Sequence, residues 1–341
     1  MYVVRPAELA DLPKLEVLAR RENRRVHTLP KQRDALARQI ERSVASFAGA
    51  AAMPAGESYT FVLEASDGRL AGTASLVAQA GAEASFLSFR QDMMHQLSPV
   101  PHVCNDVETL MLCADLSGYS QLAGYHAPAR GLDPAYKALL GRARVMYAAL
   151  APQRFAPKFF ASLPGPLDKR SGSPFWDAIG RHFFQMDFMQ VEGVLEGARN
   201  RSLIVGLMPH YPVYMALLPD AARRVVGAVD PCARTAFGIL RGEGFESNDY
   251  VDICDGGPVL QASLHALKSS AASLRRRVAP RVRGGGSGAQ RYLVSNAREY
   301  GFRAIAVSCD AVEQQDAITL APGQCRLLDV GAGDEVVCVP L

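Results

Sequence analysis

The segment that decides the fold is LAGYHAPARGLDPAYKALLGRARVMYAAL, residues 122–150. Its start, Leu122–Ala127, is typical of a strand. Asp133-Pro134 then begins a helix, because aspartate is a favoured N-cap and proline is tolerated in the first turn. Apolar side chains follow at helical spacing, at Leu139, Ala143, Met146 and Leu150. We therefore predict a strand that leads into a long helix.

Shorter patterns on both sides extend this order. Before the segment we predict a strand at Tyr2–Val4, a helix that begins at Asp11, a helix at Lys31–Phe47, a hairpin of Tyr59–Glu64 and Leu70–Val77, and a strand at Glu108–Ala114. After it we predict a strand at Lys158–Ser162. This order predicts an α+β fold, in which helices pack on a mixed or antiparallel sheet.

The character of the sequence changes after residue 265. Leu274–Arg283 is strongly basic and Gly284–Gly288 is rich in glycine, which is typical of a linker. Strand-like segments follow, at Tyr292–Ser295, Phe302–Ser308, Gln324–Val330 and Glu335–Pro340. We therefore predict a main domain over residues 1–265, a basic and Gly-rich linker over 266–290, and a small C-terminal β module over 291–341.

The composition is that of an ordinary globular protein, with 49% hydrophobic and 21% charged residues among 341. A net charge of +3 gives no indication of a nucleic-acid partner. The seven cysteines form no C-x-x-C pair, so we expect neither a disulfide framework nor a metal site. No apolar run reaches the roughly 18–20 residues of a membrane span, and the first residues leave no room for a signal peptide. We expect a cytoplasmic protein with no membrane partner.

Four strings carry a more specific signal. They are SPFWDAIGRHFF at Ser173–Phe184, LMPHYPVY at Leu207–Tyr214, EGF at Glu243–Phe245 and YVDICDGGP at Tyr250–Pro258. They are similar to signature segments of the arginine N-succinyltransferases, and the resemblance runs in order over nearly the whole chain. Residues 136–152 and 218–222 look more like the alpha-type subunit, which pairs with a homologous beta subunit. The order of elements is also that of the GNAT N-acyltransferases.

The resemblance implies a fold and an activity. The fold would be a GNAT-like acyl-CoA N-acyltransferase core with the small β module attached. The activity would be transfer of succinyl from succinyl-CoA to the α-amino group of L-arginine, or of ornithine in some members, as the first step of arginine catabolism by this route. Succinyl-CoA would be a co-substrate, with no permanently bound cofactor. The partner would be a homologous beta subunit or a second copy of the chain.

Acyl transfer requires that thioester and amine are held side by side, and that a base removes the amine proton. The resemblance implies that the pantetheine arm of CoA pairs with the strand that contains Tyr125 and Ala127, and that Tyr125 contacts succinyl-CoA. The alternative for this segment is a plain core strand. We expect the strand to diverge from its neighbour and leave a slot for the arm, with Asp230 near its mouth.

The CoA pyrophosphate usually meets backbone N–H groups at a helix N-terminus. Where GNAT proteins have a glycine-rich loop, this chain has Arg130–Lys137, RGLDPAYK. Asp133 would cap the helix and repel a phosphate, and Pro134 has no N–H. We expect Arg130, Ala135 and Lys137 to contact CoA instead. The alternative is an ordinary capped helix.

The resemblance also places the catalytic base. The family has a histidine in a G-x-V-H-P phrase, and this chain has Asp230 there, in GAVDP. Aspartate has an ordinary pKa of about 3.9 against about 6.5 for histidine, so it is the weaker base. Asp230 either relays the proton through water or merely begins a turn, as Asp-Pro often does. Two positions that usually hold glutamate in the family hold Ser162 and Gly206.

Three further charged residues are candidates for substrate binding. Asp252 and Asp255 would pair with a guanidinium group, or else they form a tight turn. Arg181 would meet the succinyl carboxylate, or else it is a solvated helix charge. The altered site leaves three hypotheses open. The chain is the arginine succinyltransferase, it is a catalytically weak subunit that stabilises or regulates an active partner, or it uses another acyl donor or amine.

Overall fold

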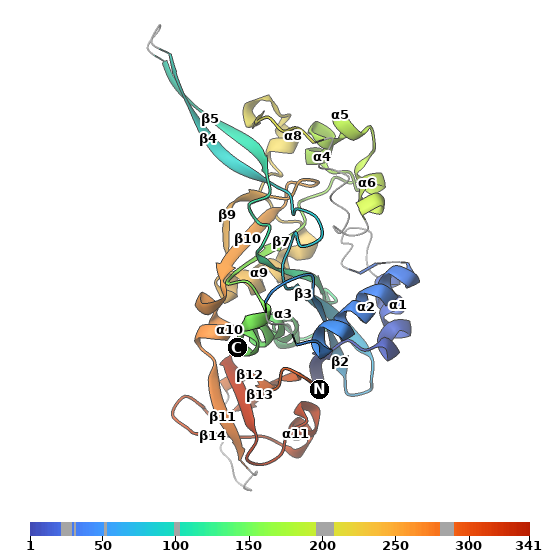
Figure 1. Ribbon diagram of the computed structural model, residues 1–341, viewed down its shortest axis with the longest axis vertical. Coiled ribbons are helices and arrows are strands. Elements are labelled where there is room, and N and C mark those ends of the chain that lie inside the picture. The colour runs from blue at the N-terminus through green and yellow to red at the C-terminus, as the bar shows by residue number, and fades with distance from the viewer. Residues whose placement is uncertain (22–28, 31, 51–52, 99–102, 196–207, 280–289) are drawn as a thin grey trace.

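A computed structural model of the chain describes residues 1–341 except 22–28, 31, 51–52, 99–102, 196–207 and 280–289 (Figure 1). The described strands form one 15-stranded sheet, and helices pack on it, so the predicted α+β class with a mixed sheet is confirmed. The strand order is β14-β11-β15-β12-β13-β1-β2-β3-β6-β7-β10-β9-β4-β5-β8. The pairs β6–β7 and β11–β14 are parallel, whereas the other described pairs are antiparallel.

The bounds of the strands are β1 Tyr2–Pro6, β2 Ser58–Ala65, β3 Leu70–Val77, β4 Ser88–Ser98, β5 Val103–Cys113, β6 Ser120–His126, β7 Lys158–Ser162, β8 Val213–Tyr214, β9 Glu246–Val251, β10 Pro258–Ser263, β11 Leu274–Ala279, β12 Gln290–Asn296, β13 Ala304–Cys309, β14 Ala317–Thr319 and β15 Glu335–Pro340. The helices are α1 Leu12–Arg21, α2 Arg33–Ala48, α3 Pro134–Leu150, α4 Pro174–Ala178, α5 Gly180–Phe184, α6 Phe188–Leu195, α8 Asp220–Arg223, α9 Arg234–Glu243, α10 Lys268–Ala271 and α11 Pro322–Leu328.

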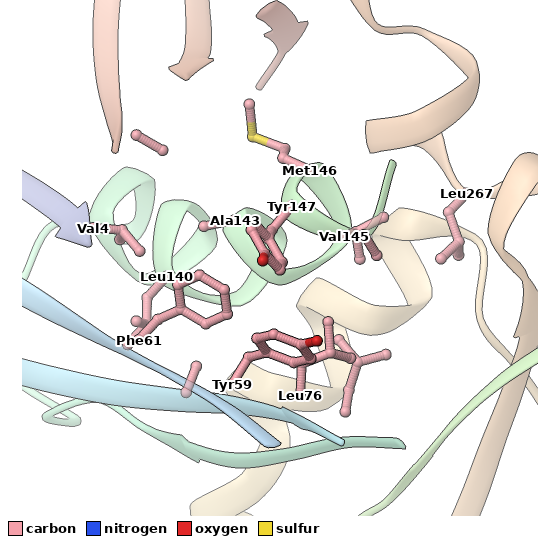
Figure 2. Close-up of a cluster of buried hydrophobic side chains, with 14 of the residues drawn as sticks. Val4, Tyr59, Phe61, Leu76, Leu140, Ala143, Val145, Met146, Tyr147 and Leu267 are labelled. Atoms are coloured by element: carbon pink, nitrogen blue, oxygen red, sulfur yellow. The ribbon is translucent and has the colours of Figure 1, made fainter. Parts of the chain in front are cut away.

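Helix α3 lies at the centre of the largest core cluster. Its residues Leu140, Ala143 and Tyr147 face the buried side chains of β2 and β3, as Figure 2 shows for Phe61 and Leu76. Around Tyr147, aromatic rings meet edge to face at centroid distances of 5.2 to 6.0 Å. Because each such ring buries a large apolar area, this helix anchors the strands on which the site is built.

A buried ion pair ties α3 to the C-terminal part of the chain. Arg142 on α3 pairs with Glu243 at the end of α9, and its Nη1 donates to the carbonyl of Pro340 at 2.9 Å. Glu243 also accepts from the backbone N–H and the hydroxyl of Ser269 on α10, both at 2.9 Å. These contacts join α3, α9, α10 and β15 through polar groups that are satisfied inside the protein.

Two sequence predictions for the C-terminal part are wrong. The predicted linker over 266–290 contains α10 and β11, and β11 pairs with β14 and β15 in the main sheet. The glycine run lies outside the described residues. Gln324–Val330, predicted as a strand, lies mostly in α11. Pro322 occupies the first turn of this helix, and Gln324 accepts from the N–H of Ala321 at 2.7 Å.

The strand β4 was not predicted, and it forms a long hairpin with β5. This hairpin projects beyond the body of the protein in Figure 1. The patterns that predicted α3, β7 and β15 are confirmed, and β7 and β15 have the predicted bounds.

Candidate functional site

The strands β6 and β7 diverge after a short parallel ladder. Only two residue pairs of the ladder are formed, Ser120 with Phe159 and Gln121 with Phe160. Beyond them lies a cavity of about 1210 Å³ between the two strands. Its lining includes all of residues 122–132, residues 161–164 at the end of β7, and residues 230–233. The expected slot beside Tyr125 is therefore open, and Asp230 lines it.

Strand β6 has a bulge where it borders the cavity. Ala123 pairs with Ser75 of β3 and His126 pairs with Thr73, so β6 has one residue more than β3 between these pairs. Gly124 has a φ of +58°, and a Cβ there would lie 2.8 Å from the Ser75 hydroxyl oxygen. Only glycine suits this position, because it is both left-handed and crowded. A bulge leaves backbone groups without ladder partners, and here they adjoin the cavity.

Asp230 is held in place through its backbone and one side-chain oxygen. Its N–H donates to the carbonyl of Pro164 at 2.9 Å, and its Oδ1 accepts from the N–H of Cys232 at 2.8 Å. The side chain thereby caps the short 3-10 helix Pro231–Ala233. Asp230 is buried, yet it lines the cavity, and Oδ2 has no partner among the described residues. One carboxylate oxygen is thus available to a ligand.

The loop that carries Pro164 is packed against a glycine turn. A Cβ on Gly257 would lie 2.1 Å from the carbonyl oxygen of Leu163 and 2.5 Å from the nitrogen of Gly165. Asp255 closes this turn by accepting from the N–H of Gly257 at 2.8 Å. Such a close approach of two backbones requires glycine, so the turn sets the position of the loop that holds Asp230.

The N-terminus of α3 has few donors left for a phosphate. Asp133 accepts from the N–H of Ala135 at 2.7 Å, and its carbonyl accepts from the N–H groups of Tyr136 and Lys137 at 3.0 and 3.3 Å. Pro134 has no N–H. The Lys137 ammonium donates to the carbonyl of Ala129 at 2.8 Å. The N-terminus of α3 is therefore an ordinary capped helix end, which was the alternative expectation. The preceding loop, residues 128–132, borders the cavity.

The structure brings together some of the predicted residues and separates others. Tyr125, Ala127, Arg130 and Asp230 line the same cavity. Ala135, Lys137, Arg181, Asp252 and Asp255 are absent from its described lining. Their roles in binding stay predictions.

The two acidic candidates for substrate binding are part of the turn at residues 252–257. Asp252 accepts from the N–H of Cys254 at 2.8 Å and from the hydroxyl of Ser162 at 3.3 Å. Ser162 itself lines the cavity, whereas Gly206 lies outside the described residues. Arg181 is exposed on α5 and pairs with Asp177 at 3.2 Å, as expected of a solvated helix charge.

One cavity residue was missed by sequence reasoning. Arg144 lies on α3, is 3% exposed and lines the cavity. Its guanidinium carbon lies 5.7 Å from the centre of the Tyr125 ring, and the Tyr125 hydroxyl donates to the carbonyl of Lys137 at 3.1 Å. Burial raises the pKa of Tyr125, so its phenol stays a donor at neutral pH. The signal in the sequence was a pair of arginines, Arg142 and Arg144, inside a largely apolar stretch of the helix.

Comparisons with known proteins agree with this architecture. The sequence profile described as "Arginine N-succinyltransferase beta subunit" matches residues 2–269, and the profile of its C-terminal domain matches residues 275–340. The chain belongs to the arginine N-succinyltransferase family. Together the two profiles span nearly the whole chain, and the second begins at residue 275, the second residue of β11.

Individual relatives include both subunit types. Arginine N-succinyltransferase subunit alpha of Pseudomonas aeruginosa is 38% identical over 98% of both chains. Subunit beta of the same organism is 32% identical over 99% of this chain and 98% of its own. Arginine N-succinyltransferase of Yersinia enterocolitica is also 32% identical, over the whole chain and 98% of its own length.

A solved structure has the same fold. It is titled as arginine/ornithine succinyltransferase subunit AI from Pseudomonas aeruginosa, and it matches with a TM-score of 0.90 and 35% identity over 100% of this chain and 98% of its own. The overall fold of the chain is therefore that of this solved structure. Among the described residues, no helix is long and apolar enough to cross a membrane, and no group of histidine, cysteine and acidic residues is arranged to hold a metal ion.

Proposed function

We propose that this chain transfers the succinyl group of succinyl-CoA to the α-amino group of L-arginine, or of ornithine. Its relatives carry the name of this activity. The observation that carries the proposal is the cavity between the diverging parallel strands β6 and β7, with Asp230 on its wall. We further propose that this is a GNAT-like core, which works in the cytoplasm.

The pantetheine arm would lie along β6. Among the described strands, none pairs with the edge of β6 from Leu122 to His126 on the β7 side, so this backbone can pair with the amides of an extended arm. The contacts at Tyr125 and Ala127 would arise in this way. Because the N–H of Ala135 is occupied, the CoA phosphates would depend on the loop 128–132 and on Arg130.

Asp230 would hold the amine beside the thioester. Its unpaired Oδ2 is suited to accept a hydrogen bond from an ammonium or amine group. The ammonium first loses one proton to water, and the neutral amine nitrogen then attacks the thioester carbonyl. A C–N bond forms, the C–S bond breaks, and the second proton that leaves the nitrogen is taken up by the CoA thiolate. No covalent enzyme intermediate is needed, because the two substrates meet directly.

A direct assay tests the proposal. Release of CoA thiol is measured with the purified chain, succinyl-CoA and arginine or ornithine. Asp230→Asn is the sharpest variant, because asparagine keeps an acceptor for the cap at Cys232 and removes only the charge. We expect kcat/KM to fall about 10- to 100-fold, the loss expected when a hydrogen bond to a charged group is removed. Unchanged activity of this variant would contradict the role of Asp230.

A second candidate is a catalytically weak subunit that stabilises or regulates a homologous beta chain. The closed N-terminus of α3 and the commitment of Asp230 Oδ1 to a cap favour it. It predicts no turnover by the chain alone and turnover when the beta chain is added. The same assay, run with and without that chain, separates the two functions. A panel of other amines and acyl-CoAs covers the possibility of a different substrate.

A further inference from the structure

Arg144 differs from the other deeply buried arginines of the described chain. Arg5, Arg142 and Arg154 each pair with a carboxylate. Arg144 pairs with none among the described residues. An unpaired cation is costly to bury, so a partner from outside the chain would be strongly favoured there.

The donors of Arg144 are only partly used. Nε donates to the carbonyl of Gly141 at 3.1 Å, and Nη1 donates to the carbonyls of Ala123 and Ser75 at 3.0 and 3.3 Å. Nη2 has no partner in the described part of the structure. The bonds to Ala123 and Ser75 fix the guanidinium under the β6 bulge, at the border of the cavity. A group that enters the cavity can therefore reach a pre-oriented donor.

The guanidinium remains charged in this setting. Burial lowers the pKa of Arg144 to about 10, and the nearby Tyr125 opposes this shift only in part. At neutral pH the group is still protonated. An anion beside it would offset the burial that disfavours its charge.

Apart from its arginines, the side chains of the described cavity lining offer an anion mainly uncharged hydroxyl groups, such as those of Ser162 and Thr235, and the imidazole of His126. The lining also includes apolar side chains at Leu122, Ala161, Leu163, Ala236 and Leu240. The other arginines of the lining are exposed: Arg69 pairs with Asp67 at 2.9 Å, and Arg130 lies on the loop after β6. A carboxylate that loses water inside the cavity would be bound most strongly by the buried, charged guanidinium.

We propose that Arg144 binds the free carboxylate of the acyl group and so selects a dicarboxylic acyl-CoA over a neutral acyl-CoA of the same length. This inference rests on the proposed function, because it assumes that the cavity takes succinyl-CoA. It gives Arg144 the role that sequence reasoning had assigned to Arg181. Arg181 is exposed, ion-paired on α5 and outside the cavity lining.

The test compares two ligands whose acyl chains have the same number of carbons but end in a carboxylate or in a methyl group. Succinyl-CoA and butyryl-CoA have acyl chains of four carbons, and their binding to the wild-type protein is measured by calorimetry without any amine. We expect succinyl-CoA to bind about 10- to 100-fold more tightly, the range for a hydrogen bond to a charged group. Equal affinities in the wild type would overturn the proposal, even if no variant folds.

Variants then assign the preference to one residue. Arg144→Gln should lose about 10- to 100-fold in affinity for succinyl-CoA and keep its affinity for butyryl-CoA, while Arg144→Lys should recover part of the preference. Arg142→Gln is the matched control, since it removes a buried arginine two residues away that is absent from the described lining. It should lower stability and keep the preference. Equal losses for both ligands in Arg144→Gln would show a structural role and refute the proposal.

The binding and transfer experiments distinguish failure of the proposed role of Arg144 from failure of the proposed function. If the chain shows the preference but acylates neither arginine nor ornithine, the proposed function fails and Arg144 keeps its role as the anion site. If it transfers succinyl to arginine with no preference over butyryl-CoA, Arg144 is excluded and the activity stands.

Discussion

The position of Asp230 depends on a backbone contact that a single methyl group can break. In Gly257→Ala the new Cβ would lie 2.1 Å from the Leu163 carbonyl oxygen. Carbon needs roughly 3.5 Å from such a neighbour, so the loop must yield by more than about 1 Å. The same loop carries the Pro164 carbonyl that holds the N–H of Asp230 at 2.9 Å. A displacement of about 1 Å at a reacting group can cost about 100-fold in rate, and we expect such a loss here.

Steady-state succinyl transfer and a thermal melt are measured on the same preparation. Gly238→Ala is the control, because Gly238 lies exposed in α9 near the site and its Cβ would meet nothing within 4 Å. This change should leave activity intact and stabilise the helix by about 0.5–1 kcal/mol. A Gly257→Ala protein with activity within threefold of wild type and an unchanged melting temperature would refute the reasoning.

Two further predictions concern stability. Glu243→Gln leaves the buried guanidinium of Arg142 without its counter-charge and should destabilise the protein by about 3–5 kcal/mol in denaturant melts. The control is Glu335→Gln, which breaks an exposed ion pair and should cost under about 1 kcal/mol. Equal losses of stability in the two variants would contradict this prediction. Burial alone would raise the pKa of Asp11, but its hydrogen bonds from Arg5 outweigh this and lower it from 3.8. Above pH 3.8 the ionised Asp11 therefore stabilises the folded protein, and this contribution is lost as the pH falls through the lower pKa of the folded state. Asp11→Asn removes the contribution, so the free energy of unfolding should fall less steeply with decreasing pH. An unchanged slope on the acid side would argue against this role of Asp11.

Elements with strong local signals were predictable from the sequence. The Asp-Pro start and apolar stripe of α3 predicted both its beginning and its end, and β7 and β15 have the predicted bounds. The strand β4 was missed because it forms an arm with polar and partly exposed side chains, which weakens the apolar signal of a strand. Basic residues at Arg275–Arg277 suggested a linker, although alternate ones simply face solvent from a strand.

Residues of the candidate site could be predicted only where a family signature segment or the order of elements indicated their position. Asp230 and Tyr125 were found in this way, and the divergence of β6 from β7 brings them to one cavity. Asp252 and Asp255 have the residue types of a guanidinium site, yet their hydrogen bonds shape a turn. Arg144 was missed because its importance arises from tertiary structure: no local pattern shows that its helix faces the bulge of a distant strand.

Two spare polar groups of opposite charge define what the cavity can hold. The first is Nη2 of Arg144 on α3, and the second is Oδ2 of Asp230 in the loop before α9. The other polar atoms of these two side chains already form hydrogen bonds within the described part of the protein. A reaction that joins a carboxylate-bearing acyl group to a cationic amine presents the complementary pair of charges. The resemblance implies that Asp230 stands where the family has a histidine, and a carboxylate at that wall interacts most strongly with an ammonium ion. In that arrangement Asp230 would bind and orient the amine, and these two effects would contribute more to the rate than base catalysis by Asp230.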